Sequence, residues 1–397
     1  MTETILGVNI GSSSLKLALY SSKEPPSRQN CILQAAITGV GSRSHLTVRD
    51  NSGKCILEKQ AAWNSHIAAL GVFLDLLKTA FGEFEIVAAG HRVVHGGSRY
   101  AGPVEIDAAV LAELRALIPF ARLHQPLALN AIEFVAAYFG SLRQVACFDT
   151  AFHVTMPKPA TTFALPRELR EQGLRRYGFH GLSYEYISGA LAERGGADVA
   201  SGRVIVAHLG SGASLCALQG GKSVATTMGL TPLDGLPMGR RSGSVDPGLL
   251  LYLLEKDPGS LEQLSLQLHT KSGLLGLSEI SDDLQVLLSR NEAAAQEAVD
   301  HFVYWVGRHL GSLAAALEGM DALVFTGGIG AHLPEIRARI CRNAAWLGVS
   351  LDGAANEAGL TRISPAGSKP SAWVIPTDEN LIVAKQTFLT LRQSHPT

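Results

Sequence analysis

The chain has 397 residues, with 34 Lys or Arg against 35 Asp or Glu, so its net charge is −1 with histidines neutral. Hydrophobic residues make up 46% and charged residues 17% of the chain, a composition that excludes intrinsic disorder and predicts large cores. The balanced charge argues against a general nucleic-acid binder, and the length predicts two or three domains.

Cysteine usage and hydropathy predict the compartment. The mean hydropathy is only +0.16, and no apolar run approaches the ~18 residues that span a membrane. Residues 1–4 lack the basic and apolar regions of an export signal. We therefore expect a cytoplasmic protein without a membrane partner. The five cysteines form no CxxC pair, which predicts buried free thiols, no disulfides and no zinc site: Cys31, Cys55, Cys147, Cys216 and Cys341.

The first predicted element is a hairpin over residues 5–20. An apolar run meets a Gly-Ser-Ser-Ser turn, after which Leu15, Leu17 and Leu19 alternate with other residues as in a strand. Residues 204–218 repeat this pattern half a chain length later. The repetition indicates an internal duplication into two similar α/β lobes.

Helices and strands then alternate along the chain. Helical spacing predicts helices over residues 106–117, 127–138 and 183–193, and an apolar run predicts a short strand over 145–148 that ends at Asp149. This alternation implies a mostly parallel or mixed sheet that is covered on both faces.

The last third of the chain contains a long loop and an amphipathic helix. Gly or Pro recurs throughout residues 226–248, which predicts an ordered functional loop. A buried stripe predicts a helix closed by Gly319, in which Tyr304 and Trp305 belong to the core or a subunit interface: Val299, Phe302, Val306, Leu310, Leu313 and Leu317. Further predicted elements are a strand at 323–325, a glycine-rich turn at 327–330, a helix from about 334, a strand at 373–375 and a helix at 381–391.

Three glycine-rich turns follow apolar strands, at residues 11–14, 210–214 and 327–330. Glycine allows backbone N–H groups to approach an anion, and serine adds hydroxyl donors. One such turn is usually a plain hairpin, but three of them, with Lys16 after the first, favour a nucleotide phosphate site. Residues 220–223 (GGKS) lack the first glycine of a P-loop, and the SxxK pattern at 13–16 lies in a strand rather than at the start of a helix.

Several charged residues sit beside glycines or strand ends. Arg92 lies between two histidines and before a Gly-Gly pair, and Arg241 lies in the long loop. Each arginine belongs either to a surface ion pair or to a bidentate anion site. Asp149 follows a strand, where ligands bind in α/β folds, and His180 lies between an aromatic residue and a glycine.

Together these segments resemble the acetate kinase family. The matching motifs run through the chain in the family order: VNIGSSSLKLAL, GHRVVHGG, CFDTAFH, RYGFHGLS, HLGSGAS, MGLTPLDGLPMGRRSGSVDPG, SGLLG, TGGIG and IPTDEN. The resemblance implies two duplicated ribonuclease H-like lobes of the sugar kinase/heat-shock chaperone/actin type, at residues 1–150 and 151–380, with ATP in the cleft between them. It also implies a homodimer built through the C-terminal lobe, and a last helix (about 381–397) that packs back on the N-terminal lobe.

The resemblance further implies the reaction and its residues. The expected activity is reversible phosphoryl transfer from ATP to acetate, giving acetyl phosphate and ADP, with Mg²⁺ or Mn²⁺. The implied metal ligands are Asn9 and Glu379, and the implied catalytic residues are Arg92, Asp149, His180 and Arg241. Arg92 also belongs to the implied acetate site, which is completed by Val94, Leu123, Phe179 and Pro232.

The implied nucleotide contacts are more numerous. They are Ser12, Ser14, Lys16, His208, Leu209, Gly210, Ser211, Gly212, Asp283, Leu284, Gln285, Gly328, Ile329, Gly330, Ala331 and His332. The chain departs from the usual family pattern on this side, at Ser211, Gln285, Ala331, His332 and Asn380. Any difference from the family is therefore expected in nucleotide affinity and base preference rather than in the chemistry.

Two alternatives remain open from the sequence. A propionate kinase would share nearly all of these motifs, because one methylene is worth only ~1–3 kcal/mol of discrimination. An actin-like or chaperone-like ATPase would share the hairpins. Because acetate is already ionised at pH 7, we expect Asp149 to orient Arg241 or water around the metal, rather than to take a proton as the family label implies.

Overall fold

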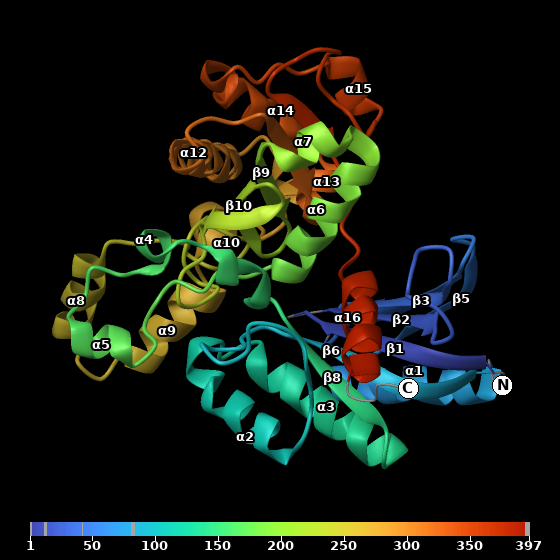
Figure 1. Cartoon of the computed structure of the whole chain (residues 1–397). Coiled ribbons are helices and arrows are strands. Elements are labelled where there is room, and N and C mark those ends of the chain that lie inside the picture. The colour runs from blue at the N-terminus through green and yellow to red at the C-terminus, as the bar shows by residue number, and fades with distance from the viewer. Residues whose placement is uncertain (1, 12–13, 42, 81–83, 394–397) are drawn as a thin grey trace. The chain divides into compact units, whose positions relative to one another are not determined.

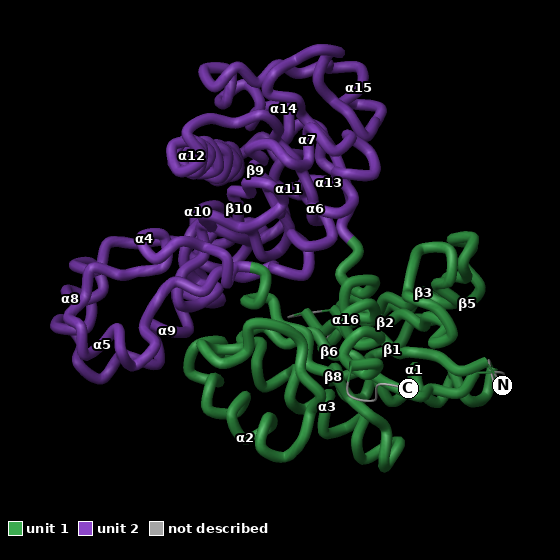
Figure 2. Tube along the Cα trace, viewed as in Figure 1, with its two compact units in different colours: residues 1–152, 378–397 green, residues 153–377 purple. Residues whose placement is uncertain are grey.

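A computed structural model describes residues 2–11, 14–41, 43–80 and 84–393 (Figure 1). The chain divides into two compact units (Figure 2). Unit 1 comprises residues 1–152 and 378–397, and unit 2 comprises residues 153–377. Within the described residues, no helix is both long and apolar enough to cross a membrane.

Unit 1 is built on a mixed sheet. Its described strands lie in the order β5-β4-β3-β2-β1-β6-β8-β7. The predicted N-terminal hairpin is confirmed: β1 and β2 are antiparallel and pair Ile10 with Leu15. The strands are β1 Thr2–Ile10, β2 Ser14–Ser21, β3 Cys31–Thr38, β4 Ser44–Asp50, β5 Cys55–Ala61, β6 Phe84–Val93, β7 Val104–Glu105 and β8 Arg143–Phe148.

Helices cover both faces of this sheet (Figure 1). Ala89 of β6 belongs to the apolar core beneath α1 (His66–Ala80) and α3 (Gln125–Phe139). Its neighbour Gly90 faces α16 (Glu379–Gln393), where an added Cβ atom would lie 2.0 Å from Thr387 Oγ1. Because adjacent strand residues point to opposite faces, α16 covers the face opposite α1 and α3. Beside α3 lies α2 (Ala108–Ala116).

Unit 2 repeats the central part of this sheet. Its described strands lie in the order β11-β10-β9-β12-β13, with the same pairing directions as β3-β2-β1-β6-β8: two antiparallel pairs followed by two parallel pairs. The predicted duplication of an α/β lobe is therefore confirmed. The strands are β9 Arg203–Leu209, β10 Ala213–Gln219, β11 Lys222–Thr226, β12 Ala322–Thr326 and β13 Ser371–Val374.

The long helix α12 (Ala293–Ala316) packs on the sheet of unit 2. All six residues of the predicted stripe are buried, so the predicted amphipathic helix is confirmed, while Tyr304 is 58% exposed. The other α-helices are α4 Lys158–Thr161, α5 Arg167–Glu171, α6 Gly181–Gly195, α7 Ala197–Ser201, α8 Pro247–Lys256, α9 Leu261–Thr270, α10 Gly273–Ser278, α11 Leu284–Leu288, α13 Gly327–His332, α14 Pro334–Asn343 and α15 Gly353–Glu357.

Three sequence-based expectations need correction. The helix expected over 106–117 begins at Ala108, because the Ile106 N–H bonds to the Gln144 carbonyl as an extension of the sheet. Residues 327–330 form the start of helix α13 rather than a turn. Cys55 is exposed, whereas the other four cysteines are buried and all five are free thiols.

Candidate functional site

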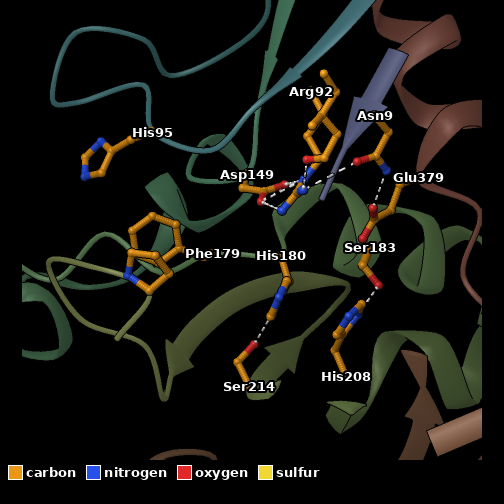
Figure 3. A network of polar contacts seen from close by, with 12 residues as sticks. Asn9, Arg92, His95, Asp149, Phe179, His180, Ser183, His208, Ser214 and Glu379 are labelled. Carbon is orange, nitrogen blue, oxygen red and sulfur yellow. Dashed lines mark hydrogen bonds and ion pairs between the residues drawn. The ribbon is translucent and has the colours of Figure 1, made fainter. Parts of the chain in front are cut away.

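The two predicted metal ligands lie together in unit 1. Asn9 stands near the end of β1, and Glu379 begins α16; the Asn9 Nδ2 donates to Glu379 Oε2 at 2.6 Å (Figure 3). Among the described residues, no group of three His, Cys, Asp or Glu side chains could hold a metal ion. One carboxylate and one amide oxygen fit Mg²⁺, which prefers oxygen ligands and keeps several waters.

Arg92 and Asp149 form a buried ion pair in the same unit. Both lie at the ends of parallel strands, β6 and β8, and Arg92 donates to Asp149 Oδ2 from Nη2 at 2.6 Å and from Nε at 3.1 Å. The Arg92 side chain is 11% exposed and that of Asp149 is fully buried. Burial opposes the charge on Arg92, but the carboxylates of Asp149 and Glu379 raise its pKa, so the guanidinium stays charged.

This pair gives Asp149 a partner that the sequence analysis did not name. A carboxylate bonded to the Nε edge fixes the plane of a guanidinium. The opposite edge of Arg92 points to the Ile10 carbonyl, 3.2 Å from Nη1. Asp149 therefore orients Arg92.

The remaining predicted residues of unit 1 differ in exposure. Val94 is buried and Leu123 is 40% exposed. In the hairpin, the Gly11 N–H bonds to the Ser14 carbonyl at 2.8 Å, and the Lys16 side chain is exposed. Ser12 lies outside the described residues.

In unit 2, the backbone around His180 is held in an uncommon conformation. His180 has φ of 58° in the left-handed region and stands at the N-cap position of α6, with no capping hydrogen bond from its side chain. The buried His153 ring bonds through Nε2 to the Phe179 carbonyl at 2.9 Å and through Nδ1 to Ser223 Oγ at 2.8 Å. Burial lowers the pKa of His153 to about 4, so this ring is a neutral structural group that fixes the turn.

The His180 ring is held from two sides. Its Nδ1 lies 2.8 Å from Ser214 Oγ on β10, and its ring stacks on that of His208 from β9, with centroids 4.2 Å apart (Figure 3). His208 in turn bonds through Nδ1 to Ser183 Oγ at 2.8 Å. The predicted residues His180 and His208 thus belong to one packed pair.

Arg241 and His180 converge beside Gly212. A Cβ atom added to Gly212 would lie 2.8 Å from Arg241 Nη2 and 3.3 Å from His180 Nε2. Arg241 Nη1 also donates to the Pro232 carbonyl at 2.8 Å, which anchors it within the long loop. Two nitrogen groups facing one point, lined by a glycine without a side chain, form an anion-binding arrangement.

Two of the predicted nucleotide segments also meet. Thr326 pairs with His208 in the parallel register of β12 and β9. A Cβ atom added to Gly210 would lie 3.8 Å from His208 Nε2 and 3.9 Å from the Gly328 N–H nitrogen. The turn after β9 and the start of α13 therefore lie side by side, as two phosphate-binding segments of one nucleotide would require.

The third predicted nucleotide segment is the start of α11. Asp283 caps this helix by accepting a bond from the Gln285 N–H at 2.8 Å, and both side chains are exposed while Leu284 is buried. At the end of α13, Ala331 is half-buried and His332 is exposed.

The sequence analysis missed several residues that support this site. Arg337 is 1% exposed and donates to the Gly330 and Ala331 carbonyls at 3.0 Å, so it fixes the end of α13. Ser214 and Tyr184 support His180. The sequence signals were present, since an arginine on the apolar side of an amphipathic helix needs buried partners, but the partners themselves cannot be read from spacing.

Comparison with known proteins identifies the family. In solved structures, the chain superposes on Porphyromonas gingivalis acetate kinase with a TM-score of 0.83 at 35% identity, covering 98% of this chain and all of that one. A Francisella tularensis propionate kinase gives a TM-score of 0.86 at 35% identity, covering 97% and 99%. The model of the acetokinase family matches residues 4–385. The chain belongs to the acetokinase family.

Acetokinase relatives match over the full length. The acetate kinase of Rhodopseudomonas palustris strain TIE-1 is 51% identical over 98% of each chain, and that of Methylocella silvestris is 43% identical over 99% of each. Acetokinases are ATP-dependent kinases, so membership in the family makes this protein an enzyme of that class. The family also confirms the two-lobed fold class expected from the sequence.

Proposed function

We propose that this acetokinase is an acetate kinase, which transfers the γ-phosphoryl group of ATP to acetate in a reversible, direct in-line reaction. The products are acetyl phosphate and ADP. The full-length relatives named acetate kinase support this assignment. The observation in the chain itself that carries it is the convergence of His180 and Arg241 beside Gly212.

The chemistry calls for charge stabilisation more than for proton transfer. Phosphoryl transfer has a loose transition state with charge spread over the equatorial oxygens. In our proposal His180 and Arg241 donate to these oxygens, while Arg92 binds the carboxylate of acetate. A carboxylic acid is already ionised at pH 7, so no general base is needed, and Asp149 orients Arg92 through their ion pair.

A metal ion completes the charge balance. Asn9 and Glu379 would hold Mg²⁺ or Mn²⁺ through their side-chain oxygens, and the bound metal would neutralise charge on the phosphates. The short Asn9–Glu379 contact supports this, because it brings two oxygen-bearing groups to one end of β1.

The nucleotide would lie along three segments of unit 2 and the hairpin of unit 1. The adjacency of residues 208–212 and 327–330 supports this placement. Ser12, Ser14 and Lys16 would contact its phosphates, and residues 283–285 and 331–332 would contact the adenosine. Initial rates with ATP, GTP and CTP test whether Gln285, Ala331 and His332 change the preference for the base.

An acetate kinase and a propionate kinase differ in the length of the acyl group that they accept. We propose that Val94, Leu123, Phe179 and Pro232 contact the methyl group of acetate. A solved neighbour is named a propionate kinase, and one extra methylene changes binding by only ~1–3 kcal/mol. The ratio of kcat/KM for acetate and propionate therefore decides between the two.

A homodimer in the cytoplasm is the remaining part of the proposal. An apolar surface on α8 and α9 of unit 2 supports self-association, because these large side chains are exposed: Leu249, Leu251, Tyr252, Leu261 and Leu266. Large exposed apolar patches mark interaction sites. The two helices contact each other.

A hydroxamate assay for acyl phosphate tests the function directly. We expect product with acetate, less with propionate, and very little with formate or butyrate. ADP release should require the acid. Turnover of ATP at the same rate without acetate would instead favour an actin-like or chaperone-like ATPase.

A further inference from the structure

The His180 ring ends a chain of hydroxyl groups in the core of unit 2. Its Nδ1 lies 2.8 Å from Ser214 Oγ, and Ser214 Oγ lies 2.5 Å from the Tyr184 hydroxyl (Figure 3 shows the first contact). Ser214 and Tyr184 are both fully buried. These contacts join α6 to β10, and neither hydroxyl belongs to the residues expected to touch substrate.

The direction of this chain follows from the donors. A phenol is a stronger hydrogen-bond donor than an alkyl alcohol, since its pKa of about 10 is lower. Tyr184 therefore donates to Ser214, and the single proton of Ser214 is free to donate to His180. A neutral imidazole that accepts at Nδ1 carries its own proton on Nε2.

The Nε2 atom is the one that matters for chemistry. It faces the same point beside Gly212 as Arg241 Nη2. With its proton on Nε2, His180 adds a second donor to that point. With the proton on Nδ1, it would present a lone pair to the same negatively charged oxygens and repel them.

We propose that Tyr184 and Ser214 are positioning residues that hold His180 as the Nε2–H tautomer, so that it donates to the transferring phosphoryl group. The identity of that group rests on the proposed function. Ser214 fixes the ring through Nδ1, Tyr184 fixes the direction of the Ser214 hydroxyl, and the stack on His208 fixes the ring plane. Neither positioning residue touches substrate.

The tautomer can be measured without substrate. Long-range ¹H–¹⁵N spectra of ¹⁵N-histidine-labelled protein distinguish the two ring nitrogens, and the His180→Gln variant assigns the signal. We expect Nε2–H for His180 in the unmodified protein. A spectrum with the proton on Nδ1 overturns the proposal, and it does so whatever substrate the enzyme proves to use.

Two variants test the hydrogen-bond chain from Tyr184 through Ser214 to His180. Tyr184→Phe keeps the ring that packs edge-on against His153, with centroids 5.6 Å apart, and removes only the hydroxyl. Ser214→Ala removes the partner of Nδ1. We expect kcat to fall roughly 10–100-fold in each, less than for loss of a donor that contacts the reacting group. KM for ATP and acetate should stay near the unmodified values, and the His180 spectrum should show both tautomers.

The matched control lies on the same helix. Ser188→Ala removes a hydroxyl that bonds the Gly221 carbonyl at 3.1 Å and should leave kcat and the His180 spectrum unchanged. If Ser214→Ala does not fold, Tyr184→Phe and the unmodified spectrum still decide. Tyr184→Phe and Ser214→Ala variants that keep both kcat and a pure Nε2–H signal would refute the role of these two residues. A protein that forms no acyl phosphate but shows the expected tautomer would refute only the proposed function.

Discussion

The Arg92 guanidinium depends on Asp149 for its orientation, and the two residues have different tasks in our proposal. Arg92 is 11% exposed and can meet a ligand, while Asp149 is fully buried and cannot. A buried ion pair contributes little net stability, but removal of one partner leaves an uncompensated charge. In our proposal Arg92 therefore binds the ligand, and Asp149 only holds Arg92 in place.

Replacement of Arg92 by Lys tests that separation. A lysine keeps the positive charge but cannot bind Asp149 and a carboxylate through two edges at once. We expect kcat to fall about 10²–10³-fold, measured by steady-state acyl phosphate formation. Arg99→Lys, at a surface pair with Glu113, should have no effect. An Arg92→Lys enzyme with normal kcat would contradict the bidentate role.

Asp149→Asn addresses the question of a general base. If Asp149 only orients Arg92, the variant loses activity equally at all pH values and keeps the shape of the pH–rate profile. Its affinity for Mg²⁺ should remain normal. Loss of the acidic limb of the profile, which reports a group that must be deprotonated to act, would show that Asp149 takes a proton.

Sequence reasoning identified the charged residues at this scale but not their supports. Arg92 and Asp149 stand at strand ends and beside glycines, which are visible in the sequence. The contact between Tyr184 and Ser214 depends on how α6 packs on β10, and no spacing rule connects two residues that lie on different elements. His153 is likewise hidden, because a lone histidine carries no sign of its partner.

At the scale of elements, helix α13 shows why the glycine-rich segment was mistaken for a turn. Glycine disfavours helices by about 1 kcal/mol relative to alanine, so consecutive glycines predict a break. Here Gly327 has φ of 77°, and an added Cβ atom would lie 2.4 Å from the Leu209 carbonyl oxygen. Close packing against β9 requires a glycine at position 327, and Arg337 then holds the end of α13.

Arg337→Met should therefore affect both stability and nucleotide binding. Loss of the guanidinium leaves the Gly330, Ala331 and Asn356 carbonyls without this donor, and each buried unpaired group costs about 1–3 kcal/mol. We expect a lower urea midpoint and a KM for ATP that rises more than that for acetate.

The control for this change is Arg339→Gln, because Arg337 and Arg339 both belong to α14. Arg339 pairs with Asp300 and Glu335 at the surface, where ion pairs are worth roughly 0–1 kcal/mol. Equal losses in the two variants would show that Arg337 has no special role at α13.

At the scale of the whole molecule, each unit contains a deeply buried histidine whose pKa is strongly lowered. Burial lowers the pKa of His91 in unit 1 and of His153 in unit 2 to about 4 in each case, although the hydrogen bonds to the Gln144 side-chain oxygen and the Phe179 carbonyl oppose the shift. The unfolded chain binds protons below pH ~6.5, where the folded chain does not. The contribution of these two histidines to the free energy of unfolding should therefore be fully present above pH 6.5 and be lost as the pH falls toward 4.

Each histidine should contribute up to roughly 3 kcal/mol to this acid sensitivity. Urea unfolding at intervals between pH 7 and pH 4.5 measures the slope. The double variant His91→Gln, His153→Gln should show a shallower slope than the unmodified protein; an unchanged slope would place the acid sensitivity elsewhere.

Self-association can be tested on the face formed by α8 and α9. Leu251 is 62% exposed, and a charge there would have to be buried if the face binds a second copy. We expect Leu251→Glu to be monomeric by light scattering, and Leu360→Glu, a change at a 54% exposed leucine outside this face, to keep the dimer mass. A dimeric Leu251→Glu protein would exclude this surface.

The order in which the two units can complete their folding follows from the position of α16 in the chain. Unit 2 is continuous in the chain, whereas unit 1 needs the segment from residue 378 onward, whose helix covers one face of its sheet. On the ribosome, unit 2 can therefore complete its fold before unit 1, because unit 1 needs the last residues of the chain to emerge. A polypeptide released before residue 378 would expose the strand glycine that Thr387 normally shields, and cellular quality control would meet an open sheet rather than a finished enzyme.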